Sequence, residues 1–191
     1  MPVDQSEWTH PDLQALLGLF FQDSTQLGRF RLVSEQQLPP SIHGLIAHNS
    51  HMTVAIERFH GTSVNLKVRN RNETASHYSR EIVLLHQATS AVLQYGIVRL
   101  NTALFSPTIM AEIKSESIPL GKILIDNGIM RQVKLMSIWQ IAAGPRLQQI
   151  FNRDGLRVCY GRTALIYTDG MPAIELLEIV PDESEINPLG H

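Results

Sequence analysis

Cysteine is almost absent from this sequence. The single cysteine, Cys159, has no partner for an internal disulfide, which fits a protein that folds in a reducing compartment. The residues around Cys159 form no metal-binding or redox motif. We therefore interpret it as a small residue within a strand.

Long hydrophobic runs are also missing. No apolar stretch approaches the ~20 residues that a membrane-spanning helix needs. The first residues, Met1 to Glu7, are polar and acidic, which is not the composition of a signal peptide. We expect a soluble, cytoplasmic protein that has no membrane partner.

Neither sign of charge is in large excess. The formal net charge is −2, so the composition does not favour a nucleic-acid partner or an anionic membrane surface. An anionic ligand would need positive groups placed locally. The 191 residues are typical of a single domain, which we expect to span residues 1–191 with its core at about 9–181. Nothing in the sequence indicates an oligomeric state.

The common catalytic signatures are absent as well. The sequence contains no Ser-His-Asp order, no glycine-rich phosphate loop and no pair of cysteines two residues apart. His43, His48 and His51 are loosely spaced in a stretch that we predict to be a loop, whereas a metal site needs a defined spacing and a further ligand. We predict no metal and no cofactor.

Patterns of apolar residues favour an α+β fold. Leu13, Leu16, Leu17, Phe20 and Phe21 recur at helical spacing and predict a helix from Thr9 to Gln22. A stretch with Pro39-Pro40 and Gly44, residues 36–49, is typical of loops. We predict strands at 52–59 and 63–69 as a hairpin around Gly61, then at 80–86, 92–105, 131–142, 158–167 and 173–180.

Three details complete that architecture. Val133, Leu135, Trp139 and Ile141 alternate and are expected on one face of their strand. Asp169-Gly170 is a strong turn signal between the last two strands. Together the patterns predict a mostly antiparallel sheet with helices packed on one side.

A helix start at Pro119 is a possible ligand-binding feature. Proline fits the first position of a helix, Ser117 or Ile118 would cap it, and Asn127-Gly128 would end it. The backbone N–H groups of Leu120 and Gly121 would then lack internal partners and could bind a carboxylate or phosphate. An ordinary capped helix under a sheet shows the same pattern, and is the simpler interpretation of this stretch alone.

Two charged residues lie in otherwise apolar strands. Arg80 opens one strand, and Glu178 shares a face with Leu176 and Val180 in another. A buried charge without a partner costs several kcal/mol, so each needs a partner or a ligand. An internal ion pair or an edge position open to water would also explain them. Glu175 is an equal candidate, because periodicity does not distinguish the two glutamates.

Three short motifs occur in order along the chain: Arg80-Glu81-Ile82-Val83-Leu84, Pro119-Leu120-Gly121, and a final strand from Pro172 to Pro181 that contains Glu178. Their order resembles that of the chorismate lyase family (chorismate pyruvate-lyase, 4-hydroxybenzoate synthase), in its small bacterial and plastid-encoded branch. Asp23-Ser24-Thr25-Gln26-Leu27 resembles the family's substrate-covering loop, and Tyr160-Gly161-Arg162-Thr163 is similar as well.

The resemblance implies a cofactor-free lyase that converts chorismate to 4-hydroxybenzoate and pyruvate and feeds quinone biosynthesis. It assigns a carboxylate of the ligand to Arg80 and to the backbone N–H groups at Leu120, Gly121, and Leu27 or Thr25. It places Glu178 at the 4-hydroxyl side of the ring, either as a base or as a hydrogen-bond acceptor. Arg80 and Glu178 are the expected catalytic residues.

A second hypothesis comes from another class of protein. The same fold resembles the effector-binding domains of some transcription regulators, which bind a small molecule and catalyse nothing. Such domains normally follow a DNA-binding domain, and the few residues before the first helix show no helix-turn-helix pattern. The missing DNA-binding pattern favours the enzyme over the effector domain.

Overall fold

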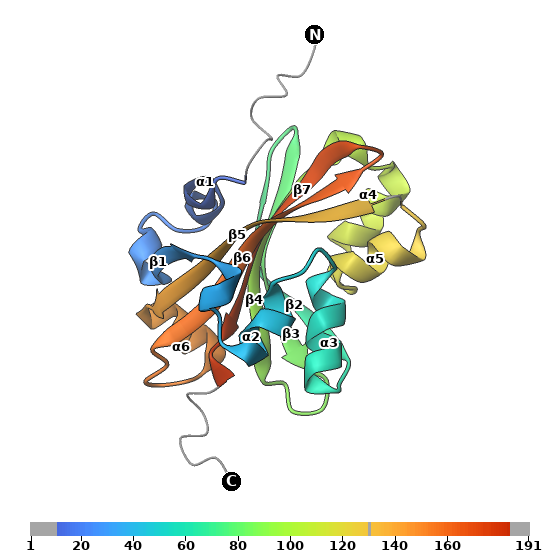
Figure 1. The fold of residues 1–191 in the computed structure, drawn as a ribbon. Helices are drawn as coiled ribbons and strands as arrows, with labels where there is room; N and C mark the ends of the chain where they lie inside the picture. Colours follow the sequence, from blue (N-terminus) through green and yellow to red (C-terminus); the bar gives the residue numbers. More distant parts are fainter. Residues whose placement is uncertain (1–10, 130, 184–191) are drawn as a thin grey trace.

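The computed structural model describes residues 11–129 and 131–183. Its core is one seven-stranded antiparallel sheet in the order β1-β5-β6-β7-β4-β3-β2 (Figure 1). The strands are β1 (Gly28–Val33), β2 (Val64–Glu73), β3 (His77–His86), β4 (Val92–Asn101), β5 (Arg131–Ala143), β6 (Val158–Thr168) and β7 (Met171–Pro181). This confirms the predicted α+β class.

Helices cover both faces of the sheet. They are α1 (Leu13–Gly18), α2 (Pro40–Ile46), α3 (Met52–His60), α4 (Pro107–Lys114), α5 (Leu120–Asp126) and α6 (Pro145–Phe151), with short 3-10 turns η2 (Ser24–Gln26), η3 (Glu35–Gln37) and η4 (Thr102–Leu104). Helices α2 to α5 pack on one face, and α1 and α6 on the other (Figure 1). The sequence predicted helices on one side of the sheet only. Helices α1 and α6 lie on the other side and were not expected there. No helix of the described part of the chain is long and apolar enough to cross a membrane.

The alternation of side chains along the strands divides the core. Tyr95, Ile97 and Leu177 point to the face of α1 and α6. Val98 and Leu176, one residue along, point to the opposite face with α4 and α5. Farther along that second face, an apolar cluster joins α2 and α3 to the sheet. The two clusters on the second face meet where charged residues come from β6 and β7.

Most predicted strands are present, and the predicted turn at Asp169-Gly170 joins β6 to β7. Both turn residues have positive φ angles, 50° and 77°, as this kind of tight hairpin requires. The first helix is shorter than predicted: Asp12 caps it and it ends at Gly18. Thr9, its expected cap, lies outside the described residues.

The hairpin predicted around Gly61 is wrong in its first half. Residues 52–59 belong to α3, whose buried residues Met52, Thr53 and Ile56 follow helical spacing. Gly61 ends this helix in the left-handed conformation, with φ at 60°, instead of forming a hairpin turn. The second half, from Val64, is β2 as predicted.

Two further corrections concern proline and a bulge. Residues 36–49 were predicted to be loop, but Pro40 occupies the first position of α2, where its missing N–H costs nothing. In β5 the register shifts between Leu135 and Ser137. This bulge reverses the alternation, so Val133 faces α4 and α5 whereas Ile141 faces α1 and α6.

Candidate functional site

A small, partly enclosed cavity lies between the sheet and the starts of α3 and α5. Its volume is about 40 Å³. The sheet supplies an apolar wall together with one pair of charged side chains, Arg162 and Glu178, and the helix starts supply Thr53, Leu120 and Gly121 among others. The apolar wall consists of Val98, Val133, Ile166 and Leu176. An apolar chamber with a few polar groups is the usual form of a small-molecule site.

The start of α5 approaches the start of α3 closely. Pro119 occupies the cap position of α5, in place of the expected Ser117 or Ile118, and no side chain caps the helix. A Cβ atom added at Gly121 would lie 3.3 Å from Nδ1 of His51, so a glycine lets the two helix starts meet. Leu120 and Gly121 both line the cavity.

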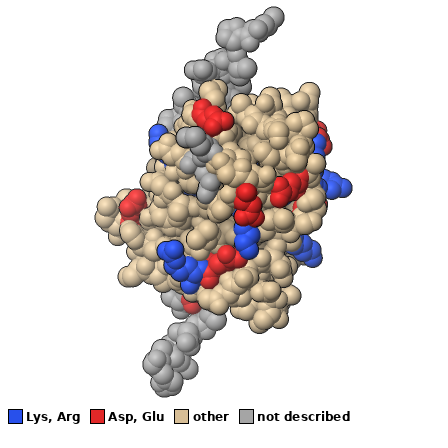
Figure 2. Space-filling model, turned by 90° about the vertical axis from the view of Figure 1, so that its right-hand side faces the viewer, with Lys and Arg blue, Asp and Glu red and all other residues tan. Residues whose placement is uncertain are grey.

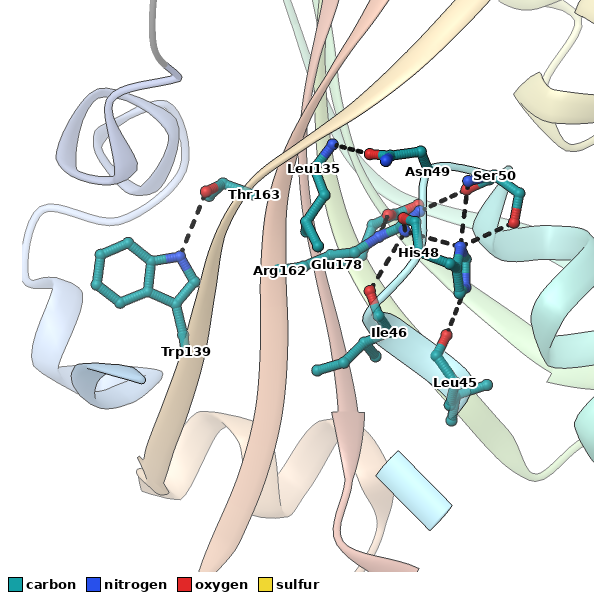
Figure 3. A network of polar contacts seen from close by, with 10 residues as sticks. All are labelled: Leu45, Ile46, His48, Asn49, Ser50, Leu135, Trp139, Arg162, Thr163 and Glu178. Atoms are coloured by element: carbon teal, nitrogen blue, oxygen red, sulfur yellow. Dashed lines mark hydrogen bonds and ion pairs between the residues drawn. The ribbon is translucent and has the colours of Figure 1, made fainter. Parts of the chain in front are cut away.

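Glu178 reaches the cavity from β7 and pairs with a neighbouring strand. Its Oε2 accepts a hydrogen bond of 2.7 Å from Nε of Arg162, which lies opposite Glu178 on the adjacent strand β6 (Figure 3). The side chain of Arg162 has no exposed surface, and Glu178 is 8% exposed. The opposite charges of this buried pair compensate each other.

Arg80 does not itself line the cavity: it lies one row away on the same face of the sheet, beside Val98 of the cavity wall. It is 1% exposed, and its Nη1 donates to the carbonyl of Ile113 in the last turn of α4 at 3.2 Å. No described group accepts a hydrogen bond from its Nε or Nη2. Burial lowers the pKa of Arg80, and the neighbouring Tyr78 and Glu116 oppose that effect. Arg80 is thus a buried cation whose Nε and Nη2 make no well-formed hydrogen bond, although the Tyr78 side chain also interacts with it.

Arg80 and Glu178 do not form the internal ion pair that was considered from the sequence. β4 separates their strands, and Glu178 pairs with Arg162 instead. Glu175 projects from the opposite face of β7 and pairs with Arg99. Of the two candidate glutamates, only Glu178 lines the cavity.

The structure does not bring Thr25 and Leu27 to this cavity. Leu27 is buried in the apolar cluster of α1 and α6, on the other face of the sheet. Its amide donates to the carbonyl of Ser24 at 3.2 Å, and the amide of Thr25 donates to Asp23 Oδ1 at 2.9 Å. Both amides are therefore already used within their own turn.

The three histidines of the sequence occupy separate environments. His48 contacts the carbonyl of Leu45 through Nε2 at 2.7 Å, and Ser50 donates its amide to Nδ1 at 3.2 Å. Burial lowers the pKa of His48, and the charge of Arg162 adds to this effect. His43 lies near Glu35, and His51 lines the cavity. The described residues contain no group of three possible ligands that could hold a metal ion.

An open groove of about 1010 Å³ adjoins the cavity and shares His51 and Val133 with its walls. Ser50, Lys134 and Tyr167 also line this groove. It is the natural side from which a ligand could approach the cavity. On the side of the molecule shown in Figure 2, basic and acidic residues are interspersed.

Arg162 is the residue that sequence reasoning missed as a member of the site. It was noted only within the motif Tyr160 to Thr163. Its signal was the one that identified Arg80, namely a charge inside a strand that is otherwise apolar. Its partners, Glu178 and the residues before α3, are far away in the sequence and required the fold.

Comparison with known proteins supports the fold. Full-length PhnF from Mycobacterium smegmatis matches with a TM-score of 0.53 at 13% identity, over 70% of this chain and 64% of PhnF. The effector domain of PhnF matches with a TM-score of 0.53 at 14% identity, over 71% of this chain and 90% of that domain. A GntR-family transcriptional regulator from Bacillus cereus is more distant, with a TM-score of 0.45 at 13% identity, over 63% of this chain and 93% of that one.

The similarity to PhnF shows that this chain has the fold of the PhnF effector domain. The chain spans less than two thirds of the full-length PhnF that it matches. No protein-family model and no curated protein sequence matches the chain. The comparisons therefore give the architecture, and the function has to be argued from the site.

Proposed function

We propose that this chain binds a small aromatic or cyclic carboxylic acid in the cavity between the sheet and the starts of α3 and α5, and that it does so as a binding protein. The observation that carries this proposal is Arg80. A buried guanidinium with two nitrogens in no well-formed hydrogen bond is costly unless a ligand completes it. The planar fork of arginine matches a carboxylate. The effector-domain fold of PhnF supports a binding role over a catalytic one.

The present cavity has to enlarge before such a ligand can enter. Its volume of about 40 Å³ is close to the share of one water molecule, whereas ligand pockets typically measure ~300–1,000 Å³. The adjoining groove shares His51 and Val133 with its walls. Movement of the segment before α3 would join the two spaces.

Calorimetric titration with benzoate and benzamide tests the binding proposal. The two molecules have the same ring, but only benzoate carries a charge for Arg80. We expect benzoate to bind and benzamide to bind at least tenfold more weakly. Equal affinities, or no binding of either, would contradict the proposal.

The second candidate is a chorismate lyase, and the position of Glu178 favours it. Glu178 lines the same cavity as Leu120 and Gly121, with its carboxylate held by Arg162. In the reaction a proton leaves ring carbon 4 and the bond from carbon 3 to the ether oxygen breaks. The electron pair of the C–H bond completes the aromatic ring, and the enolpyruvate that leaves becomes pyruvate. Glu178 could accept that proton or bind the hydroxyl that remains.

Incubation of the protein with chorismate separates the two candidates. The lyase predicts equimolar 4-hydroxybenzoate and pyruvate, lost in Glu178→Gln and retained in Glu175→Gln. Binding without products favours the binding protein. Products formed equally well by Glu178→Gln would remove Glu178 from the reaction.

A further inference from the structure

One side chain holds both Glu178 and the segment that borders the cavity. The Nε of Arg162 donates to Glu178 at 2.7 Å. Its two remaining nitrogens point the other way, to the connection between α2 and α3 (Figure 3). Nη1 donates to the carbonyl of His48 at 2.8 Å and Nη2 to that of Ser50 at 3.0 Å. A longer contact of 3.5 Å reaches the carbonyl of Ile46.

Beyond the apolar packing of Ile46 and Ala47, this connection, residues 46–50, makes one other described hydrogen bond to the sheet. The side chain of Asn49 accepts a hydrogen bond of 2.8 Å from the amide of Leu135, next to the bulge of β5. Within the connection, the amide of His48 donates to Ile46 and that of Ser50 to the His48 ring. The segment leads directly to His51, which lines both the cavity and the groove.

We propose that Arg162 is a positioning residue that couples the orientation of Glu178 to the closed conformation of residues 46–50. The inference deepens the proposed function, because it assumes that Glu178 faces the ligand. If the segment moves away to admit a ligand, Arg162 loses its carbonyl acceptors while Glu178 still binds Nε. The guanidinium can then turn, and the carboxylate turns with it. Closure over a ligand restores both positions together.

The chemistry of arginine is essential to this coupling. Its rigid plane presents Nε on one side and two further nitrogens on the other, so one group can bind a carboxylate and two carbonyls at fixed angles. A lysine has one nitrogen and cannot span these acceptors. Arg162→Lys therefore keeps the positive charge beside Glu178 and removes the connection to His48 and Ser50.

Hydrogen exchange tests the coupling without any ligand. In Arg162→Lys we expect the amides of Ala47, His48 and Ser50 to exchange at least tenfold faster than in the wild type. Glu178→Gln is the second variant: it leaves Arg162 intact but without a counter-charge, which favours the open segment that exposes the cation to water. We expect faster exchange there too. Arg99→Lys, which alters the neighbouring Arg99–Glu175 pair on the opposite face, is the matched control. Unchanged exchange in both test variants would overturn the proposal.

A selectivity measurement then links the coupling to the ligand. The probes are 4-hydroxybenzoate and benzoate, which differ by the hydroxyl that Glu178 would accept. For Arg162→Lys we expect 4-hydroxybenzoate to lose about tenfold more affinity than benzoate, so that the ratio of their affinities falls about tenfold. An unchanged ratio would overturn the positioning role, and an equal loss for both acids would reduce Arg162 to a structural residue. If the wild type binds neither acid, the proposed function fails, and hydrogen exchange still decides whether Arg162 couples Glu178 to the segment.

Discussion

Two buried arginines lie on the same face of the sheet and differ in how fully they are satisfied. Each nitrogen of Arg162 has a protein acceptor, and its charge is balanced by Glu178. Arg80 is equally buried, yet only its Nη1 reaches an acceptor, the carbonyl of Ile113. The comparison separates an arginine that belongs to the protein's own structure from one that has donors left for a ligand.

The largest expected effect is on stability. Replacing Arg162 by methionine leaves Glu178 buried without its counter-charge, which typically costs about 3–5 kcal/mol. Replacing Arg80 by methionine removes a poorly satisfied cation, so we expect the free energy of unfolding to stay within about 1 kcal/mol of the wild type or to rise. Urea unfolding of both variants measures the difference. Similar losses in both would show that Arg80 is as structural as Arg162.

The next effect concerns the two glutamates of β7. Glu178→Gln should lower the preference for 4-hydroxybenzoate over benzoate about tenfold, because the amide no longer offers a charged acceptor at that position. Glu175→Gln alters a buried glutamate on the opposite face, whose partner Arg99 is more exposed than Arg162, and should leave the preference unchanged. Calorimetry on the two variants measures both ratios. A larger change for Glu175→Gln would place the ligand on the wrong face of the sheet.

A smaller effect is expected at the start of α5. Gly121→Ala adds a methyl group 3.3 Å from the ring of His51, while alanine favours the helix by about 1 kcal/mol over glycine. These terms oppose each other, so stability should change by less than about 1 kcal/mol. The added methyl group narrows the cavity, and benzoate should bind more weakly. Gly18→Ala, where the added atom meets nothing within 4 Å, is the control and should not alter binding.

The smallest expected effect is the pH dependence contributed by His48. Burial and the charge of Arg162 lower its pKa below the ordinary 6.5, against the opposing influence of Leu45, Glu178 and Ser50. The unfolded chain therefore takes up this proton more readily, so the stabilising contribution present above pH 6.5 decreases as the pH falls through that value. Urea unfolding of wild type and His48→Gln should show their difference shrinking toward low pH. A difference that grows toward low pH would contradict a lowered pKa of His48 in the folded protein.

The sequence was sufficient where local patterns and final packing agree. The strand around Ile82, the turn at Asp169-Gly170 and the helix start at Leu120 follow from periodicity and turn chemistry. Arg80 and Glu178 stood out because a charge in an apolar strand requires an explanation. Glu178 then proved to line the cavity with Leu120.

The failures arose where long-range packing decided the outcome. Met52, Val54 and Ile56 alternate like a strand, yet Val54 is 40% exposed because α3 presents Met52, Thr53 and Ile56 to the sheet. The single extra residue of the β5 bulge has no signature in the sequence. The pairing of Arg162 with Glu178 depends on strand register, and its hold on Ser50 depends on how α2 and α3 cross the sheet.

The most direct test of the central claim is calorimetric titration of benzoate into the wild type and Arg80→Met. Two hydrogen bonds to a buried cation are worth about 3 kcal/mol, or about a hundredfold in affinity. We predict measurable binding to the wild type and a loss of about that size in the variant, which should remain folded. Equal affinity for benzoate in the two proteins would show that the free donors of Arg80 are not the carboxylate site.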